Sequence, residues 1–144
     1  MSNWLLLLYK VSPEPTARRV YVWRKLKRLG AILLHDSVWV LPPTPYTREQ
    51  LQWLVAEIVE MEGDAMLWDA TLASPEQDTA LVHQFQMQVE SAYSEILAQL
   101  QDKSCDLEAL SRRYQQVQMT DYFHSVRGQQ VRHALMAAKG DAEL

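Results

Sequence analysis

Residues 4 to 72 alternate short apolar runs with helical patterns, and the order of these segments restricts the fold more than any other feature of the chain. The run from Trp4 to Lys10 has the length of a strand, and its continuous apolar character is typical of a strand buried on both faces. The prolines of "SPEP" end it, because proline cannot donate to a strand ladder. A helix of about 13 residues is expected next, with Thr16 as its N-cap and Gly30 just past its end.

The following residues repeat this alternation. Ala31 to Val40 is rich in β-formers, is interrupted near residues 35–37 and ends at "LPPTP", which predicts two short strands with a tight turn or one long bent strand. Thr47 to Gln50 matches a capping box and opens a second helix that Gly63 closes, and Ala65 to Leu72 is the last strand. The order β-α-β-β-α-β is that of the ferredoxin-like plait, in which two helices cover one face of a four-stranded antiparallel sheet.

A helical extension follows the plait. "SPEQ", from Ser74, is another capping box, and no strong helix breaker follows it for about 25 residues. Two further helices are expected after it. We therefore predict an α+β protein with a ferredoxin-like domain over residues 1–73 and a helical extension over residues 74–144, packed on it as a single globular unit. The open face of the sheet then needs a cover, which the extension or the second subunit of a homodimer can provide.

Composition is that of a single-domain globular protein. With 144 residues, 48% of them hydrophobic, the chain is long enough for one compact core. No apolar run approaches the roughly 18 residues of a membrane-spanning helix, and the first residues do not resemble a secretory signal. Cys105 is the single cysteine and cannot form an internal disulfide, so we expect a cytoplasmic protein.

Charge is segregated along the chain, although the net charge is only −4. Residues 1–48 hold eight Lys or Arg and two acids, whereas residues 49–108 hold one Lys and thirteen acids. The acidic balance argues against a protein that coats nucleic acid, but a basic face on an acidic body is compatible with directed phosphate contact. Mutual neutralisation of the two segments in the fold would explain the same pattern.

The first helix carries six Arg or Lys in "RRVYVWRKLKR", residues 18–28. A helical wheel places a core-facing stripe at Val22, Trp23, Leu26 and Leu29. The opposite half holds Arg18, Arg24, Lys25, Lys27 and Arg28. No acid lies between Glu14 and Asp36, so these charges repel one another instead of forming i,i+4 pairs. They are either the solvated face of a core-packed helix or a surface that contacts DNA phosphates or an acidic partner.

Arg19 differs from its neighbours because the wheel puts it inside the apolar stripe. A guanidinium there has to reach around to the sheet edge, pair with a buried carboxylate such as Asp36 or Asp69, or bind an anion. Lys10, at the end of the first strand, is expected near Arg19 as a second positive charge. Lys10 and Arg19 are therefore the candidate anion-binding residues.

The sequence lacks recognisable motifs for catalysis or for a bound cofactor. Its four histidines and Cys105 have no metal-ligand spacing, its glycines are scattered singly, and no nucleophile-elbow motif occurs. The string "DYFHS", from Asp121, either packs beneath the helical extension, or stacks on a base or lines a small pocket. We predict no metal, no cofactor and no catalytic residue.

Several segments together resemble the N-terminal domain of the chromate-resistance regulator ChrB. They are "VWRKLKRLGA", "DSVWVLP" and "TREQLQWL", preceded by a strand and "PEP", and the resemblance extends over about residues 4–72, with a looser likeness around "RRYQQVQMTDYF". The pattern is also similar to the central domain of PaaX-type repressors and, more distantly, to a small CRISPR-associated ribonuclease. These families are ferredoxin-like, so the resemblance implies the fold that the segment order predicts.

The resemblance also implies transcription control, in a family that regulates chromate-efflux genes. Full-length ChrB proteins carry a further C-terminal domain, so a separately encoded protein of that type is an expected partner. In the CRISPR relatives the first strand ends in a metal-binding aspartate, whereas Tyr9 or Lys10 stands here, and an ammonium group repels a cation. We therefore expect a non-enzymatic, DNA-associated regulatory protein. The alternatives are a sensor of chromate or a similar oxyanion, a protein-interaction module, and a degenerate metal-dependent nuclease.

Overall fold

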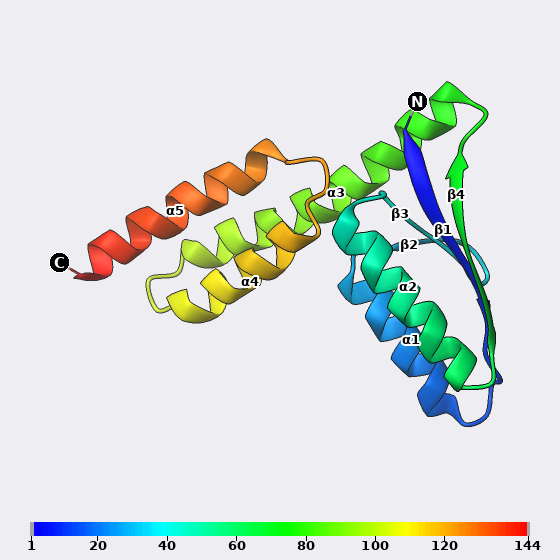
Figure 1. The fold of residues 1–144 in the computed structure, drawn as a ribbon. Coiled ribbons are helices and arrows are strands. Elements are labelled where there is room, and N and C mark those ends of the chain that lie inside the picture. Colours follow the sequence, from blue (N-terminus) through cyan, green and yellow to red (C-terminus); the bar gives the residue numbers. More distant parts are fainter. Residues whose placement is uncertain (1, 144) are drawn as a thin grey trace. The chain divides into compact units, whose positions relative to one another are not determined.

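The computed structural model describes residues 2–143 and shows an α+β fold (Figure 1). In chain order the elements are β1 (Asn3–Lys10), α1 (Thr16–Arg28), β2 (Ile32–His35), β3 (Val38–Leu41), α2 (Pro45–Glu60), β4 (Asp64–Thr71), α3 (Pro75–Leu100), α4 (Leu107–Met119) and α5 (Val126–Glu143). The predicted order, a ferredoxin-like plait followed by three helices, is confirmed. No helix in the described part of the chain combines the length and apolar character needed to cross a membrane.

The four strands form one antiparallel sheet in the order β2-β3-β1-β4. Leu7 of β1 pairs with Trp39 of β3 and with Leu67 of β4, and residues paired in this way point to the same face of the sheet. Helices α1 and α2 lie side by side against one face (Figure 1). The fully buried side chains of these strands and helices include Leu5, Leu7, Val22, Leu26, Leu51, Leu54 and Ile58.

A tight turn joins β2 to β3, so the alternative of one bent strand is wrong. Asp36 in this turn has a φ of 42°, in the left-handed region that aspartate tolerates better than most residues. β2 has four residues and forms one edge of the sheet. The sheet is therefore short on the side that carries β2.

The start of α1 differs by one residue from its predicted position. Thr16 is the first helical residue and not the N-cap, because Pro15 takes the cap position and offers no side-chain hydrogen bond. At the other end Gly30 has a φ of 80° and donates its N–H to the Lys27 carbonyl. This bond belongs to a Schellman motif, which confirms Gly30 as the residue just past the helix.

Helix α2 begins three residues before its predicted start. Its N-cap is Thr44, whose hydroxyl accepts the Thr47 N–H (3.0 Å), while the Thr47 hydroxyl accepts the Thr44 N–H (2.8 Å). The predicted capping box at Thr47 is therefore wrong, since Thr47 is the third helical residue of a box that Thr44 opens. Pro45 occupies the first helical position, where its missing N–H costs nothing, so "LPPTP" both ends a strand and starts a helix.

Gly63 does not close α2 in the predicted way. Glu62, with a φ of 65°, takes the left-handed position after the C-cap residue Met61. Gly63 is needed for space instead, because a Cβ at this position would lie 2.6 Å from the carbonyl oxygen of Lys10. The glycine thus permits the close approach of β1 at the start of β4.

The chain divides into two compact units, Met1–Thr79 and Ala80–Leu144, and the boundary falls within α3. In the second unit Phe85 lies 6.5 Å from the Tyr122 ring and 6.3 Å from the Phe123 ring, so the packing of "DYFHS" is confirmed. A buried cluster consists of Val89, Tyr93, Ile96, Leu110, Val117, Val131 and Leu135. The domain boundary at residue 73, the packing of the extension on the plait and the cover of the open sheet face stay predictions.

Candidate functional site

The buried stripe of α1 is narrower than the helical wheel predicts. Val22, Leu26 and Leu29 are buried as expected, whereas Trp23 is 50% exposed. A wheel does not show how far the underlying sheet extends, and on this side the sheet ends with the short strand β2. The prediction that Trp23 belongs to the core is therefore wrong.

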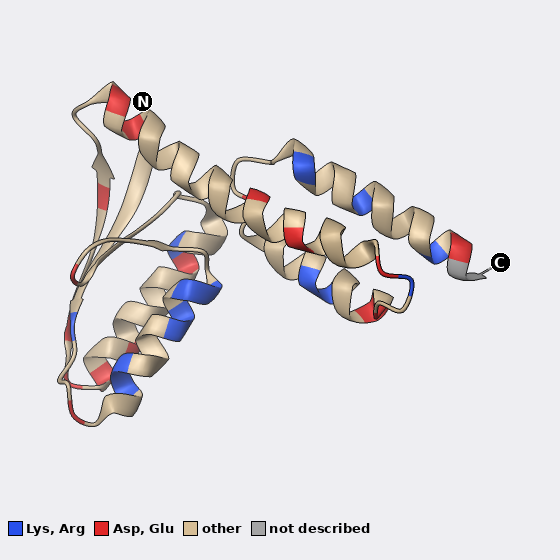
Figure 2. Cartoon of the chain, turned by 180° about the vertical axis from the view of Figure 1, so that it is seen from behind, with Lys and Arg blue, Asp and Glu red and all other residues tan. Residues whose placement is uncertain are grey.

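Three of the five cations predicted for the outer half of α1 are exposed. They are Arg24, Lys27 and Arg28, and none of them makes an ion pair within residues 2–143. Lys25 is half-buried, with its Nζ 4.0 Å from a carboxylate oxygen of Glu57 on α2. Figure 2 shows Lys and Arg positions gathered along α1.

Arg18 does not belong to this exposed group. Its side chain is half-buried and donates a hydrogen bond of 2.9 Å to the carbonyl of Met61, the C-cap residue of α2. A cation is stabilised at the C-terminus of a helix, where backbone carbonyls lack partners. The wheel misplaced Arg18 because it describes α1 alone and takes no account of α2 beside it.

Aromatic side chains accompany the exposed cations. The Nζ of Lys27 lies 5.8 Å from the centre of the Trp23 ring, a cation–π arrangement. Tyr21 donates a hydrogen bond to the Glu57 carboxylate, which raises the pKa of the Tyr21 hydroxyl above its ordinary value. We call Trp23, Arg24, Lys27 and Arg28 the basic face of α1.

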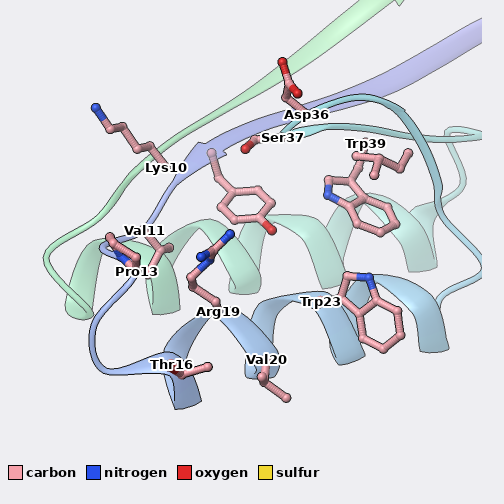
Figure 3. Close-up of a pocket in the computed structure, with 12 residues that line it drawn as sticks. Lys10, Val11, Pro13, Thr16, Arg19, Val20, Trp23, Asp36, Ser37 and Trp39 are labelled. Atoms are coloured by element: carbon pink, nitrogen blue, oxygen red, sulfur yellow. The ribbon is translucent and has the colours of Figure 1, made fainter.

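An open pocket of about 600 Å³ lies beside α1 in the first unit. Residues of the end of β1, of α1 and of the β2–β3 turn line it (Figure 3). Its apolar walls include Val11, Pro13, Val20 and Leu33. Sites for small organic molecules have this composition, a mostly apolar lining with a few placed polar groups. We call it the Arg19 pocket.

Arg19 faces this pocket and is not part of the core. It is exposed, and no hydrogen bond or ion pair of its side chain is found among the described residues. The predicted ion pair of Arg19 with Asp69 is wrong, because Arg48 donates two hydrogen bonds of 2.7 and 3.1 Å to the Asp69 carboxylate. These bonds keep the Asp69 pKa below its usual value. Asp36 also lines the pocket, but Figure 3 shows its carboxylate turned away from Arg19. A cavity therefore lies where the wheel predicted core.

Trp39 is the site residue that sequence reasoning missed. It is only 3% exposed, and its indole N–H lies near the Tyr9 hydroxyl without forming a hydrogen bond of good geometry in the described structure. Burial raises the pKa of Tyr9, and the nearby Trp39 indole and Arg19 charge oppose this rise to a smaller extent. The sequence carries no signal that singles out Trp39, because all four residues of "VWVL" are apolar, and only pairing with Leu7 shows that it lies on the helix-covered face.

Lys10 lines the same pocket at the end of β1. In Figure 3 its ammonium group points away from Arg19, and in the sheet Lys10 is paired in register with Asp64 of β4. The two candidate anion-binding residues therefore share a pocket without converging on one point. That Lys10 supplies a second charge for an anion stays a prediction.

The polar groups gathered beside α1 are mainly cations and hydrogen-bond donors, which suit the binding of an anion. Within residues 2–143 no group of three His, Cys, Asp or Glu side chains could hold a metal ion. Cys105 is half-buried in the second unit, between α3 and α4.

The fold and the site define a class of protein, a ferredoxin-like domain with a basic helix and an adjoining aromatic pocket, followed by three helices. The family described as "Protein ChrB, N-terminal" matches residues 19–108, more than half of the chain, and the chain belongs to this family. Protein ChrB of Cupriavidus metallidurans is 31% identical over 75 residues, which cover 52% of this chain and 23% of that protein. The family match begins at residue 19, later than the predicted start of the resemblance at residue 4, and extends past residue 72 to residue 108.

Proposed function

We propose that this chain is a non-enzymatic regulatory protein in chromate resistance, and that the basic face of α1 contacts the phosphates of duplex DNA. Membership of the ChrB N-terminal family supports the regulatory role. The DNA contact is supported by one observation above all, the exposure of Arg24, Lys27 and Arg28 without an ion pair in the described chain.

The surroundings of these three cations favour an external anionic partner. They lie within about one helical turn and therefore form one patch. Glu57 of α2, which contacts α1, is already engaged by Tyr21 and Lys25. A solvated helix face usually mixes charges of both signs, whereas this one leaves its mutual repulsion unrelieved.

Phosphate contact predicts a defined dependence on salt. Each neutralised phosphate of duplex DNA contributes about −0.9 to the slope of log K against log salt concentration. Three phosphate contacts therefore predict a slope of about −3. Contacts to phosphates do not by themselves distinguish one base sequence from another.

The test is fluorescence anisotropy with a labelled DNA duplex over a range of salt concentrations. The triple variant Arg24→Gln/Lys27→Gln/Arg28→Gln should lose at least about tenfold in affinity at low salt and most of the slope. The matched control, Arg112→Gln/Arg113→Gln/Arg127→Gln, removes the same charge from exposed positions of α4 and α5. This control variant should bind the duplex with nearly the affinity of the unmodified protein.

Two results would contradict the proposal. One is no binding of the unmodified protein to duplex DNA even at low salt. The other is an equal loss of affinity in both triple variants, which would indicate a response to net charge and not to the basic face.

A second candidate function is anion sensing at the Arg19 pocket. It is favoured by the position of Arg19, an exposed guanidinium at an open pocket that also includes Lys10. Chromate or a similar oxyanion is the first ligand to test, and Arg19→Ala should abolish any thermal stabilisation of the protein by chromate or sulfate.

A further inference from the structure

We propose that the Arg19 pocket binds a small aromatic carboxylic acid. This inference rests on the second candidate function, anion binding at Arg19. It changes the expected ligand from a bare tetrahedral oxyanion to an organic anion with a flat apolar body.

The charged end of the ligand is identified by two donors at the pocket that make no well-formed hydrogen bond within the described chain. The Arg19 guanidinium is exposed to the pocket and unpaired in the described chain. The buried Trp39 indole N–H lies near the Tyr9 hydroxyl but forms no hydrogen bond of good geometry with a described residue. Figure 3 shows the indole nitrogen of Trp39 on the side of its ring that faces Arg19. A carboxylate between them satisfies the indole N–H and matches the planar fork of the guanidinium.

The first turn of α1 adds to the preference for an anion. Thr16 lines the pocket, and this helix start has neither a side-chain cap nor an acidic residue. Its backbone N–H groups therefore contribute positive potential near Arg19. Among the described residues that line the pocket, Asp36 is the one carboxylate, and it is turned away from Arg19 in Figure 3.

The flat apolar body is identified by the walls of the pocket. Val20, Trp23 and Leu33 all line it and are 37%, 50% and 45% exposed. A ring placed against them would remove apolar surface from water, whereas a bare oxyanion would leave that surface wet. The volume of about 600 Å³ lies in the range of organic ligands.

Nuclear magnetic resonance of the isotope-labelled full chain tests the inference, with naphthoate as the probe. Each of the five tryptophans contributes one indole N–H signal, which single Trp→Phe substitutions assign. Naphthoate should shift the signals of Trp23 and Trp39 in a saturable way. Trp53 and Trp68, which are exposed on α2 and β4, should not respond and serve as internal references.

Two comparisons establish which end of the probe matters. Arg19→Gln should weaken naphthoate binding by about tenfold to a hundredfold, since a charge-assisted bond is lost. Arg24→Gln, with the same change of charge on the same helix but outside the pocket lining, should leave the affinity unchanged. The neutral alcohol analogue of naphthoate should bind as weakly as naphthoate binds to Arg19→Gln.

The possible failures are distinguishable. If sulfate or chromate shifts the Trp39 signal as strongly as naphthoate does, anion sensing stands and the aromatic acid is excluded. If the alcohol binds as well as the acid, or if Trp53 and Trp68 respond in parallel, the pocket is not an anion site for this class. If no anion moves the Trp39 signal, both the inference and the second candidate function are wrong. DNA binding through Arg24 is measured separately and is unaffected by each of these results.

Discussion

At the scale of single residues, Arg18 and Arg19 show how adjacent side chains of one helix acquire different surroundings. They lie about 100° apart on the helix, because an α-helix has 3.6 residues per turn. Arg18 reaches the C-terminal carbonyl of α2, whereas Arg19 faces the pocket. The helical wheel placed Arg18 outside and Arg19 inside, so both positions had to be corrected.

This difference predicts different effects on stability. Arg18→Ala removes a charge-assisted hydrogen bond from a half-buried position and should lower the free energy of unfolding by about 1–2 kcal/mol. Arg19→Ala removes no contact of this kind and should change it by less than about 0.5 kcal/mol. Urea denaturation measures both values, and a larger loss for Arg19→Ala than for Arg18→Ala would contradict the assignment.

At the scale of elements, helix ends are positioned by local chemistry that the sequence contains in several equivalent forms. Thr44 and Thr47 can each start a capping box, and the proline between them decides for Thr44. Glu62 and Gly63 both follow the end of α2, and Glu62 takes the left-handed conformation. Gly63 has to be glycine because a Cβ there would collide with the Lys10 carbonyl oxygen. Local patterns therefore predict that an end exists more reliably than where it lies.

Gly63→Ala tests the close approach of β1 to this turn. A methyl group there would lie 2.6 Å from a backbone oxygen, so the strand or the turn has to move, and a loss of about 1–3 kcal/mol in unfolding free energy is expected. Gly140→Ala on α5 is the matched control, because a Cβ there meets nothing within 4 Å among the described residues. It should be neutral or stabilising, by up to about 1 kcal/mol. Equal effects of the two substitutions in thermal or urea unfolding would show that Gly63 is not needed for space.

At the scale of the whole chain, the segregation of charge is only partly relieved by contact. The ion pairs found among the described residues are Lys25–Glu57 and Arg48–Asp69. Mutual neutralisation therefore does not account for the exposed cations of the basic face. A homodimer and a separately encoded partner of the ChrB C-terminal type stay predictions.

Asp78 connects distant parts of the first unit. It accepts hydrogen bonds from the Trp4 indole N–H (2.7 Å) and the Ser2 backbone N–H (3.1 Å), and these bonds, chiefly that of Trp4, hold the Asp78 pKa below its ordinary value. Because the folded-state pKa is lowered, the charged carboxylate stabilises the fold above the unfolded pKa of about 3.9. This stabilisation is lost as the pH falls through the folded-state pKa.

Asp78→Asn should therefore lower the Tm at pH near 7, and the difference from the unmodified protein should shrink at about pH 3 and below. Glu49→Gln removes a charge from an exposed position of α2 and should change the Tm little at either pH. Thermal unfolding followed by circular dichroism measures these values. A Tm difference for Asp78→Asn that does not depend on pH would contradict the role of the charge.

The sequence by itself determined the order of the elements, the ferredoxin-like plait and the three helices after it. These follow from periodicity, capping residues and breakers, which act between neighbours in the chain. The basic character of α1 and the choice of Arg19 as a candidate anion-binding residue also followed from the sequence.

Only the tertiary structure decided which side chains meet solvent, α2 or a pocket. Trp23 is exposed because the sheet ends at β2, Arg18 is engaged because α2 ends beside it, and Trp39 joins Arg19 because strand pairing puts it on the helix-covered face. A helical wheel ranks the faces of one isolated element. What covers each face depends on the extent and placement of the neighbouring elements, and these are properties of the folded chain.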